Sequence, residues 1–185
     1  MASSGADAME SGASPGRLRV LFDAALELAH SHERDTLLRR IVEGGASVAD
    51  ARYAALGVYD DEGQLVTFVH HGVDDVTIEE IGDYPEGRGL LSEVIVADRP
   101  VRLENLSSHP SSFGFPSGHP PMDTFLGVPI LRAGHRYGTL YLTEKAHGAT
   151  FDEADESLVV ALAAFAAGAI ETSELLSLDV GRAAA

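Results

Sequence analysis

The sequence predicts an α+β domain in which a central antiparallel sheet carries long helices on one face. Apolar residues recur at helical spacing near both ends, over residues 17–49 and 152–176. Between them, residues 53–71 and 124–143 each contain two alternating apolar and polar runs that are joined by a short turn sequence. Because the long helices precede and follow the strands instead of alternating with them, an antiparallel sheet is favoured over a parallel one.

The helical pattern is broad at both ends of the domain. Asp152 is a suitable N-cap for the final helix, because its carboxylate can accept hydrogen bonds from the first backbone N–H groups. The apolar stripe of the first helix contains Leu18, Leu21, Phe22, Ala25, Leu26 and Leu28. The predicted helices, two of them short, cover residues 17–30, 33–49, 75–81, 90–97 and 152–176.

The strands are expected as two hairpins and one short segment. Asp61-Glu62-Gly63 supplies the first hairpin turn and Ala133-Gly134-His135 the second. A loop over residues 105–123 is long for a compact domain, and such loops are usually functional or disordered. The predicted strands cover residues 53–59, 65–71, 101–103, 124–131 and 137–143.

Alternation along the strands divides the sheet into two different faces. Leu140 and Leu142 share one face of the last strand, and Tyr141 points to the other, with Thr139 and Thr143. In the first strand Leu56 and Val58 oppose Ala55 and Gly57. We expect the Leu, Val and Ile faces to pack on the first and last helices. The opposite face, with its small residues and a tyrosine, is then available as a ligand pocket beneath the short helices and the long loop.

Composition restricts the classes of function. The chain has 185 residues, a net charge of −16 at pH 7 and no cysteine, and one domain is expected over residues 16–178, between tails at 1–15 and 179–185. The acidic charge disfavours nucleic acids and anionic membranes. The lack of cysteine excludes disulfides, zinc–thiolate sites and iron–sulfur clusters. The first residues lack a signal-peptide pattern and the apolar run 158–170 is too short to span a bilayer, so a cytoplasmic protein is expected.

His119 is the main candidate for chemistry. It lies in the long loop and is followed directly by Pro120 and Pro121, which restrict the backbone and lower the entropy cost of fixing the ring. From the residues alone it is either a surface histidine or an axial ligand for iron, for which neutral imidazole is well suited. The sequence contains no G-x-S-x-G, P-loop, dinucleotide-binding or H-E-x-x-H motif, so the corresponding enzyme classes have no support.

Several motifs together resemble a known family. The order of elements, with GVPI, YGTLYLTEK and an F-x-x-x-D run into a long helix, looks like a GAF domain. Within that family, the stretch LENLSSHPSSFGFPSGHPPMDTFLGVPI closely resembles the first, haem-binding GAF domain of the mycobacterial dormancy oxygen and redox sensor kinases. The likeness implies a GAF fold that carries haem b on its sheet.

The resemblance also implies roles for single residues. The histidine of the HPPM motif is the proximal haem ligand of those sensors and falls on His119. The tyrosine of the LYLT motif lies on the distal side near bound gas and falls on Tyr141, and Gly57 matches the version with a more open route to the haem. Those kinases also carry a second GAF domain and a kinase transmitter, which this sequence lacks. A signal is therefore expected to pass through a partner protein.

Further pocket residues follow from position along the chain. His70 and His71 are adjacent in a strand, so only one of them can face the pocket, where it could meet a haem propionate or the distal side. His109, in a second His-Pro pair of the same loop, is favoured as a surface residue. The suitable apolar walls, each also explained as ordinary core, are Phe68, Phe113, Phe115 and Met122.

Three functions remain open at this point. The first is a haem-b gas or redox sensor that binds O₂, NO or CO and forms a homodimer through its first and last helices. The second is a free-standing haem-dependent enzyme that activates O₂, peroxide or an N–O substrate, since the cofactor supplies the chemistry. The third is a haem-free GAF module for another small molecule, although no N-K-F-D-E cyclic-nucleotide motif is present.

Overall fold

The predicted α+β fold is confirmed. The computed structural model describes residues 13–60, 62, 64–74, 77, 97–110 and 118–183. Within these residues the helices are α1 (Pro15–Ala29), α2 (Arg34–Ala49) and α5 (Glu153–Ala183), with one 3₁₀ turn, η1 (Ala146–Gly148). The strands are β1 (Ala51–Tyr59), β2 (Leu65–His71), β3 (Val101–Leu103), β4 (Phe125–Arg132) and β5 (His135–Lys145).

The strands form one antiparallel sheet in the order β2-β1-β5-β4-β3. The two hairpins, β1–β2 and β4–β5, are those that the sequence predicts, and β5 pairs with β1 to join them at the centre. The turn between β4 and β5 is shorter than expected, because Arg132 pairs with His135 and leaves two connecting residues. These are Ala133 and Gly134, whose positive φ angles of 51° and 82° suit the twist of a two-residue hairpin.

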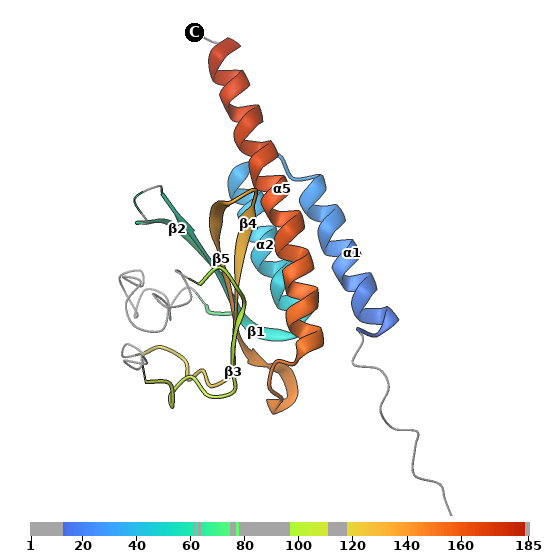
Figure 1. The fold of residues 1–185 in the computed structure, drawn as a ribbon, viewed down its shortest axis with the longest axis vertical. Helices are drawn as coiled ribbons and strands as arrows, with labels where there is room; N and C mark the ends of the chain where they lie inside the picture. The colour runs from blue at the N-terminus through green and yellow to red at the C-terminus, as the bar shows by residue number, and fades with distance from the viewer. Residues whose placement is uncertain are drawn as a thin grey trace, which may run out of the picture.

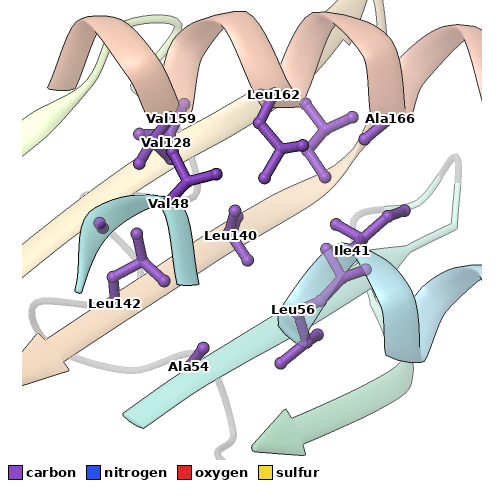
Figure 2. Packing of buried hydrophobic residues seen from close by; sticks show 14 of the residues in the cluster. Ile41, Val48, Ala54, Leu56, Val128, Leu140, Leu142, Val159, Leu162 and Ala166 are labelled. Atoms are coloured by element: carbon purple, nitrogen blue, oxygen red, sulfur yellow. The ribbon is translucent and has the colours of Figure 1, made fainter. Parts of the chain in front are cut away.

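The hydrophobic core lies between the sheet and the helices, as strand alternation predicts. Leu56, Leu140 and Leu142 point from the sheet toward Leu162 of α5 and Ile41 of α2, and Figure 2 shows their side chains interdigitating. All five are completely buried. The opposite face of the sheet is therefore separated from the helices by a full layer of apolar side chains.

The first helix does not cover the sheet as the sequence suggests. α2 and α5 pack directly on the strands, and α1 packs on those two helices as an outer layer (Figure 1). Only part of its apolar stripe is buried, because α1 has neighbours on one side alone. Leu18, Phe22 and Leu26 are exposed, with 40%, 60% and 56% of their surface accessible.

α5 begins as predicted, at an N-cap formed by Asp152. The Asp152 carboxylate accepts from the backbone N–H of Asp155 at 2.8 Å, and the Asp155 carboxylate accepts from that of Asp152 at 2.9 Å. The fully buried Asp155 also binds Lys145 of β5, at 2.8 Å, and Arg17 of α1. One carboxylate therefore joins the start of α5 to the sheet and to the outer helix.

The last helix is longer than the sequence indicates, since it continues to residue 183 instead of ending near 176. By length and composition alone, its segment Glu153–Ser177 could cross a membrane, which the shorter run 158–170 could not. Val159, Leu162 and Ala166 of this segment are fully buried in the hydrophobic core (Figure 2). The two short helices expected over residues 75–81 and 90–97 lie almost wholly outside the described residues.

Candidate functional site

The sheet face that points away from the helices carries the predicted site residues; we call it the open face. One row of paired positions crosses all five strands, and it runs from His70 through Ala55, Tyr141 and Gly127 to Val101. Ala55 and Gly127 are small, so the larger side chains of His70 and Tyr141 stand on either side of Ala55. The row combines space with polar groups, as a ligand-binding face requires.

An apolar cluster covers the β3–β4 side of the open face. Leu106, from the segment after β3, packs with Phe125 and Tyr141, and the rings of the last two have centroids 6.3 Å apart. Met122 packs against this cluster, and its sulfur accepts a hydrogen bond from the Thr143 hydroxyl at 3.1 Å. Met122 therefore lies on the face that the sequence predicts for it.

Two tyrosine hydroxyls meet at the centre of the open face. Tyr59 Oη and Tyr141 Oη are 2.8 Å apart. Tyr59 reaches this position by lying back over Gly57, where a Cβ atom would stand 2.7 Å from its hydroxyl oxygen. The absence of a side chain at Gly57 therefore gives the Tyr59 phenol its place on the open face.

Burial dominates the chemistry of both phenols. It raises the pKa of Tyr141 strongly, and the neighbouring Tyr59 adds to that effect. Burial also raises the pKa of Tyr59, while the hydrogen bond with Tyr141 and the charge of Arg136 oppose the rise. Both groups are therefore neutral hydroxyls at physiological pH and can serve as hydrogen-bond donors.

Arg136 brings a positive charge to the edge of the same face. Its guanidinium donates to the Thr139 hydroxyl at 3.5 Å, to the Ala97 carbonyl at 3.0 Å and to the Asp98 carboxylate at 2.6 Å. The register of β4 against β5 shifts by one residue here, with Tyr137 as the additional residue. This bulge turns Arg136 toward Thr139 and lets the Tyr137 ring enter the core.

His70 also lies on the open face. Its neighbour His71 is exposed, as expected because adjacent strand residues point to opposite faces. The Nδ1 atom of His70 is buried and has no hydrogen-bond partner. An unpaired buried polar atom costs about 1–3 kcal/mol, which a bound ligand could recover. Phe68, opposite Gly57, is half-buried beside it.

His119 has a defined ring tautomer. Its Nδ1 lies 2.8 Å from the carbonyl oxygen of Pro120, and because a carbonyl can only accept, Nδ1 carries the proton. The Nε2 atom then holds the lone pair that an iron ligand needs, and this second hydrogen bond is typical of metal-binding histidines. The following residues are tied to β5, because the Glu144 carboxylate accepts from the backbone N–H groups of Asp123 and Thr124.

The open face thus contains Gly57, Phe68, His70, Met122 and Tyr141 of the predicted site. Phe113 and Phe115 lie outside the described residues. Sequence analysis did not identify Tyr59, Thr139 or Arg136 as site residues. Because side chains alternate along a strand, the positions of Ala55 and Gly57 could have predicted that Tyr59 lies on the open face. The bulge at Tyr137 interrupts this alternation in β5, so the same rule does not predict the position of Arg136. In the described part of the chain, no three His, Asp or Glu side chains gather as a metal site.

Comparison with known proteins identifies the fold. Residues 31–171 match the family model of the GAF domain. The chain belongs to the GAF domain family. Among solved structures it is similar to a GAF domain of a phosphoenolpyruvate-protein phosphotransferase from Coxiella burnetii, with a TM-score of 0.74, 23% identity and coverage of 88% of this chain and 96% of that one.

Two further solved structures are similar to this chain. One is free methionine-R-sulfoxide reductase from Neisseria meningitidis in complex with its substrate, with a TM-score of 0.70 and 20% identity over 91% of this chain and 98% of that one. The other is the GAF domain of a putative sensor histidine kinase from Pseudomonas syringae pv. tomato, with a TM-score of 0.62 and 20% identity over 90% and 93%. At these identities the likeness establishes the GAF fold alone, so the function must be sought in the residues of the open face.

Proposed function

We propose that this GAF domain is a sensor module that binds haem b on its open face, with His119 as the proximal iron ligand. The observation that carries the proposal is the hydrogen bond from His119 Nδ1 to the Pro120 carbonyl, at 2.8 Å. Because Nδ1 carries the proton of this bond, Nε2 is the ring nitrogen that would bind iron. His119 would hold the haem iron through one imidazole, and the iron would supply the chemistry that binds a diatomic gas.

The rest of the open face suits the same cofactor. Leu106, Phe125 and Met122 form an apolar cluster on this face, and the small residue Ala55 stands in its central row. The buried Nδ1 of His70 lacks a partner, and a carboxylate such as a propionate could provide one. The hydroxyl pair of Tyr59 and Tyr141 offers hydrogen-bond donor capacity for a ligand atom.

The test is an absorption spectrum of the purified chain after haem reconstitution, in the oxidised, reduced and CO-bound forms. We expect a Soret band that is lost or strongly shifted in His119→Ala. His32→Ala is a matched control, because His32 Nδ1 makes the same type of bond to a carbonyl, that of His30, at an exposed helix connection. A His119→Ala spectrum identical to that of the unmodified protein would contradict the assignment.

The same purified protein distinguishes the two alternative functions. A protein that takes up no haem under these conditions would be a GAF module for another small molecule. A loaded protein that turns over peroxide or an N–O substrate, with the rate lowered in Tyr141→Phe, would be an enzyme. A loaded protein that forms a slowly oxidising O₂ complex without turnover is the expected sensor.

We also propose that α1 and α5 pair with a second copy of the chain. Phe22 and Leu26 of α1 and Phe165 and Leu176 of α5 are all more than two-fifths exposed. A groove between these helices is lined by Ala25, Leu28, Phe165 and Leu176, with other small and polar residues. Exposed apolar groups gathered on a helical layer are typical of an interface.

A further inference from the structure

Four polar side chains form a line across the open face. Arg136 Nη1 donates to Thr139 Oγ1 at 3.5 Å, and Tyr141 Oη lies 2.8 Å from Tyr59 Oη. Thr139 and Tyr141 are two residues apart on the same face of β5, and the Thr139 hydroxyl acts to lower the pKa of the Tyr141 phenol. The line therefore runs from Arg136 through Thr139 and Tyr141 to Tyr59.

The first member of the line can only donate, which favours one direction along it. A guanidinium has no acceptor, so the Thr139 oxygen accepts from Arg136 and the Thr139 proton is available to Tyr141. In this direction the Tyr141 oxygen is the acceptor for Thr139, and the Tyr141 hydroxyl donates to Tyr59. The Tyr59 oxygen accepts that proton, and its own hydroxyl proton is the last in the line. Hydrogen bonds that share donors and acceptors in this way polarise one another in the same direction.

We propose that Tyr59, and not Tyr141, is the residue whose hydroxyl donates a hydrogen bond to the ligand of this site, so that the ligand presents an acceptor atom there. The proposal rests on the proposed function and reassigns the donor that the family resemblance implies. Accessibility agrees with it, because Tyr141 is 6% exposed whereas Tyr59 is half-buried. The lack of a Cβ atom at Gly57 gives the Tyr59 phenol its place.

The electrostatics of the pair point in the same direction. Burial raises the pKa of both phenols, and the hydrogen bond with Tyr141 opposes that rise at Tyr59. Arg136, the first member of the line, opposes the rise at both. These effects agree with Tyr59 as the hydroxyl that donates outward from the pair.

The ligand-bound test compares two phenol deletions. In the haem-loaded protein, Tyr59→Phe should raise the O₂ dissociation rate about fivefold, the loss of one neutral hydrogen bond. Tyr141→Phe leaves the Tyr59 hydroxyl in place and should raise that rate less than twofold. Tyr53→Phe, a buried tyrosine from the same strand that takes no part in the line, is the control and should leave the rate unchanged. A larger effect of Tyr141→Phe, or equal rates in all variants, would overturn the proposal.

A second measurement needs no haem. In cofactor-free protein labelled at tyrosine Cζ, a pH titration followed by NMR should show Tyr59 ionising before Tyr141, and Tyr141→Phe should raise the pKa of Tyr59. Ionisation of Tyr141 first, or no change in Tyr59 in that variant, would refute the direction of donation. A protein without a Soret band would contradict the proposed function. The titration would still decide whether Tyr141 donates to Tyr59, which leaves the Tyr59 hydroxyl as the outward donor.

Discussion

Replacement of Asp155 by asparagine should cost the protein a large part of its stability. The change keeps the size of the side chain and the oxygen that accepts from the Asp152 backbone, so it removes mainly the charge. Lys145 and Arg17 then lose their shared counter-ion, with side chains only 14% and 29% exposed. Breaking a buried ion pair from one side costs about 3–5 kcal/mol, and the partial exposure of Arg17 favours the lower value, about 3 kcal/mol.

Urea unfolding at several pH values measures this loss. At a typical slope of about 2 kcal/mol per molar urea, the midpoint should fall by about 1.5 M at pH 7. Burial alone raises the pKa of Asp155, but its bonds to Lys145 and the Asp152 backbone, together with nearby positive charge, outweigh burial and lower it. The stabilisation is therefore complete above the ordinary pKa of 3.8 and is lost as the pH falls through the lowered folded value. The difference between the two proteins should thus be constant from about pH 6 to 8 and shrink below about pH 4.

Asp23→Asn is the matched control. Asp23 faces Arg19 at 3.7 Å, one turn away on α1, and both side chains are mostly exposed, so this change should alter stability by less than about 0.5 kcal/mol. If Asp155→Asn lost as little, or if its loss were the same at pH 3 as at pH 7, the reasoning about a buried ionic junction would be refuted.

Two further predictions concern the open face and the helical layer. Gly57→Ala places a methyl group 2.7 Å from the Tyr59 hydroxyl and should move that phenol away from Tyr141. Because the group that moves is the end of a side chain, the free energy of unfolding should fall by only about 1 kcal/mol. The ligand dissociation rate should rise as it does in Tyr59→Phe. Unchanged ligand dissociation rates would show that Gly57 does not control the position of the two phenols. Phe22→Glu puts a charge at a position where the side chain is 60% exposed, and sedimentation should show a monomer in place of a dimer while the melting temperature stays nearly unchanged. Arg19→Glu, on the same helix, is the control. A protein that is monomeric before any substitution would refute the interface.

The alternation of apolar and polar residues in strands, together with helix-capping and turn residues, predicted most of the fold. The faces of β1, β4 and β5, the N-cap Asp152 and the β1–β2 and β4–β5 hairpins depend on local spacing, which sequence carries directly. The position of α1 was predicted wrongly, since an apolar stripe indicates a partner without saying whether that partner is a sheet or another helix. Three of the four polar residues in line on the open face were missed. Arg136 turns toward Thr139 through a bulge, and the contact between Tyr59 and Tyr141 joins residues far apart in sequence.

The outer position of α1 has a consequence for how a movement of this helix can reach the sheet. The match to the GAF family begins at residue 31, just after this helix, and the main contacts of α1 are with α2 and α5. A displacement of α1 would therefore reach the strands mainly through α2, α5 and the Arg17–Asp155 ion pair. The outer helix and the open face lie on opposite sides of the core and are connected through these two helices.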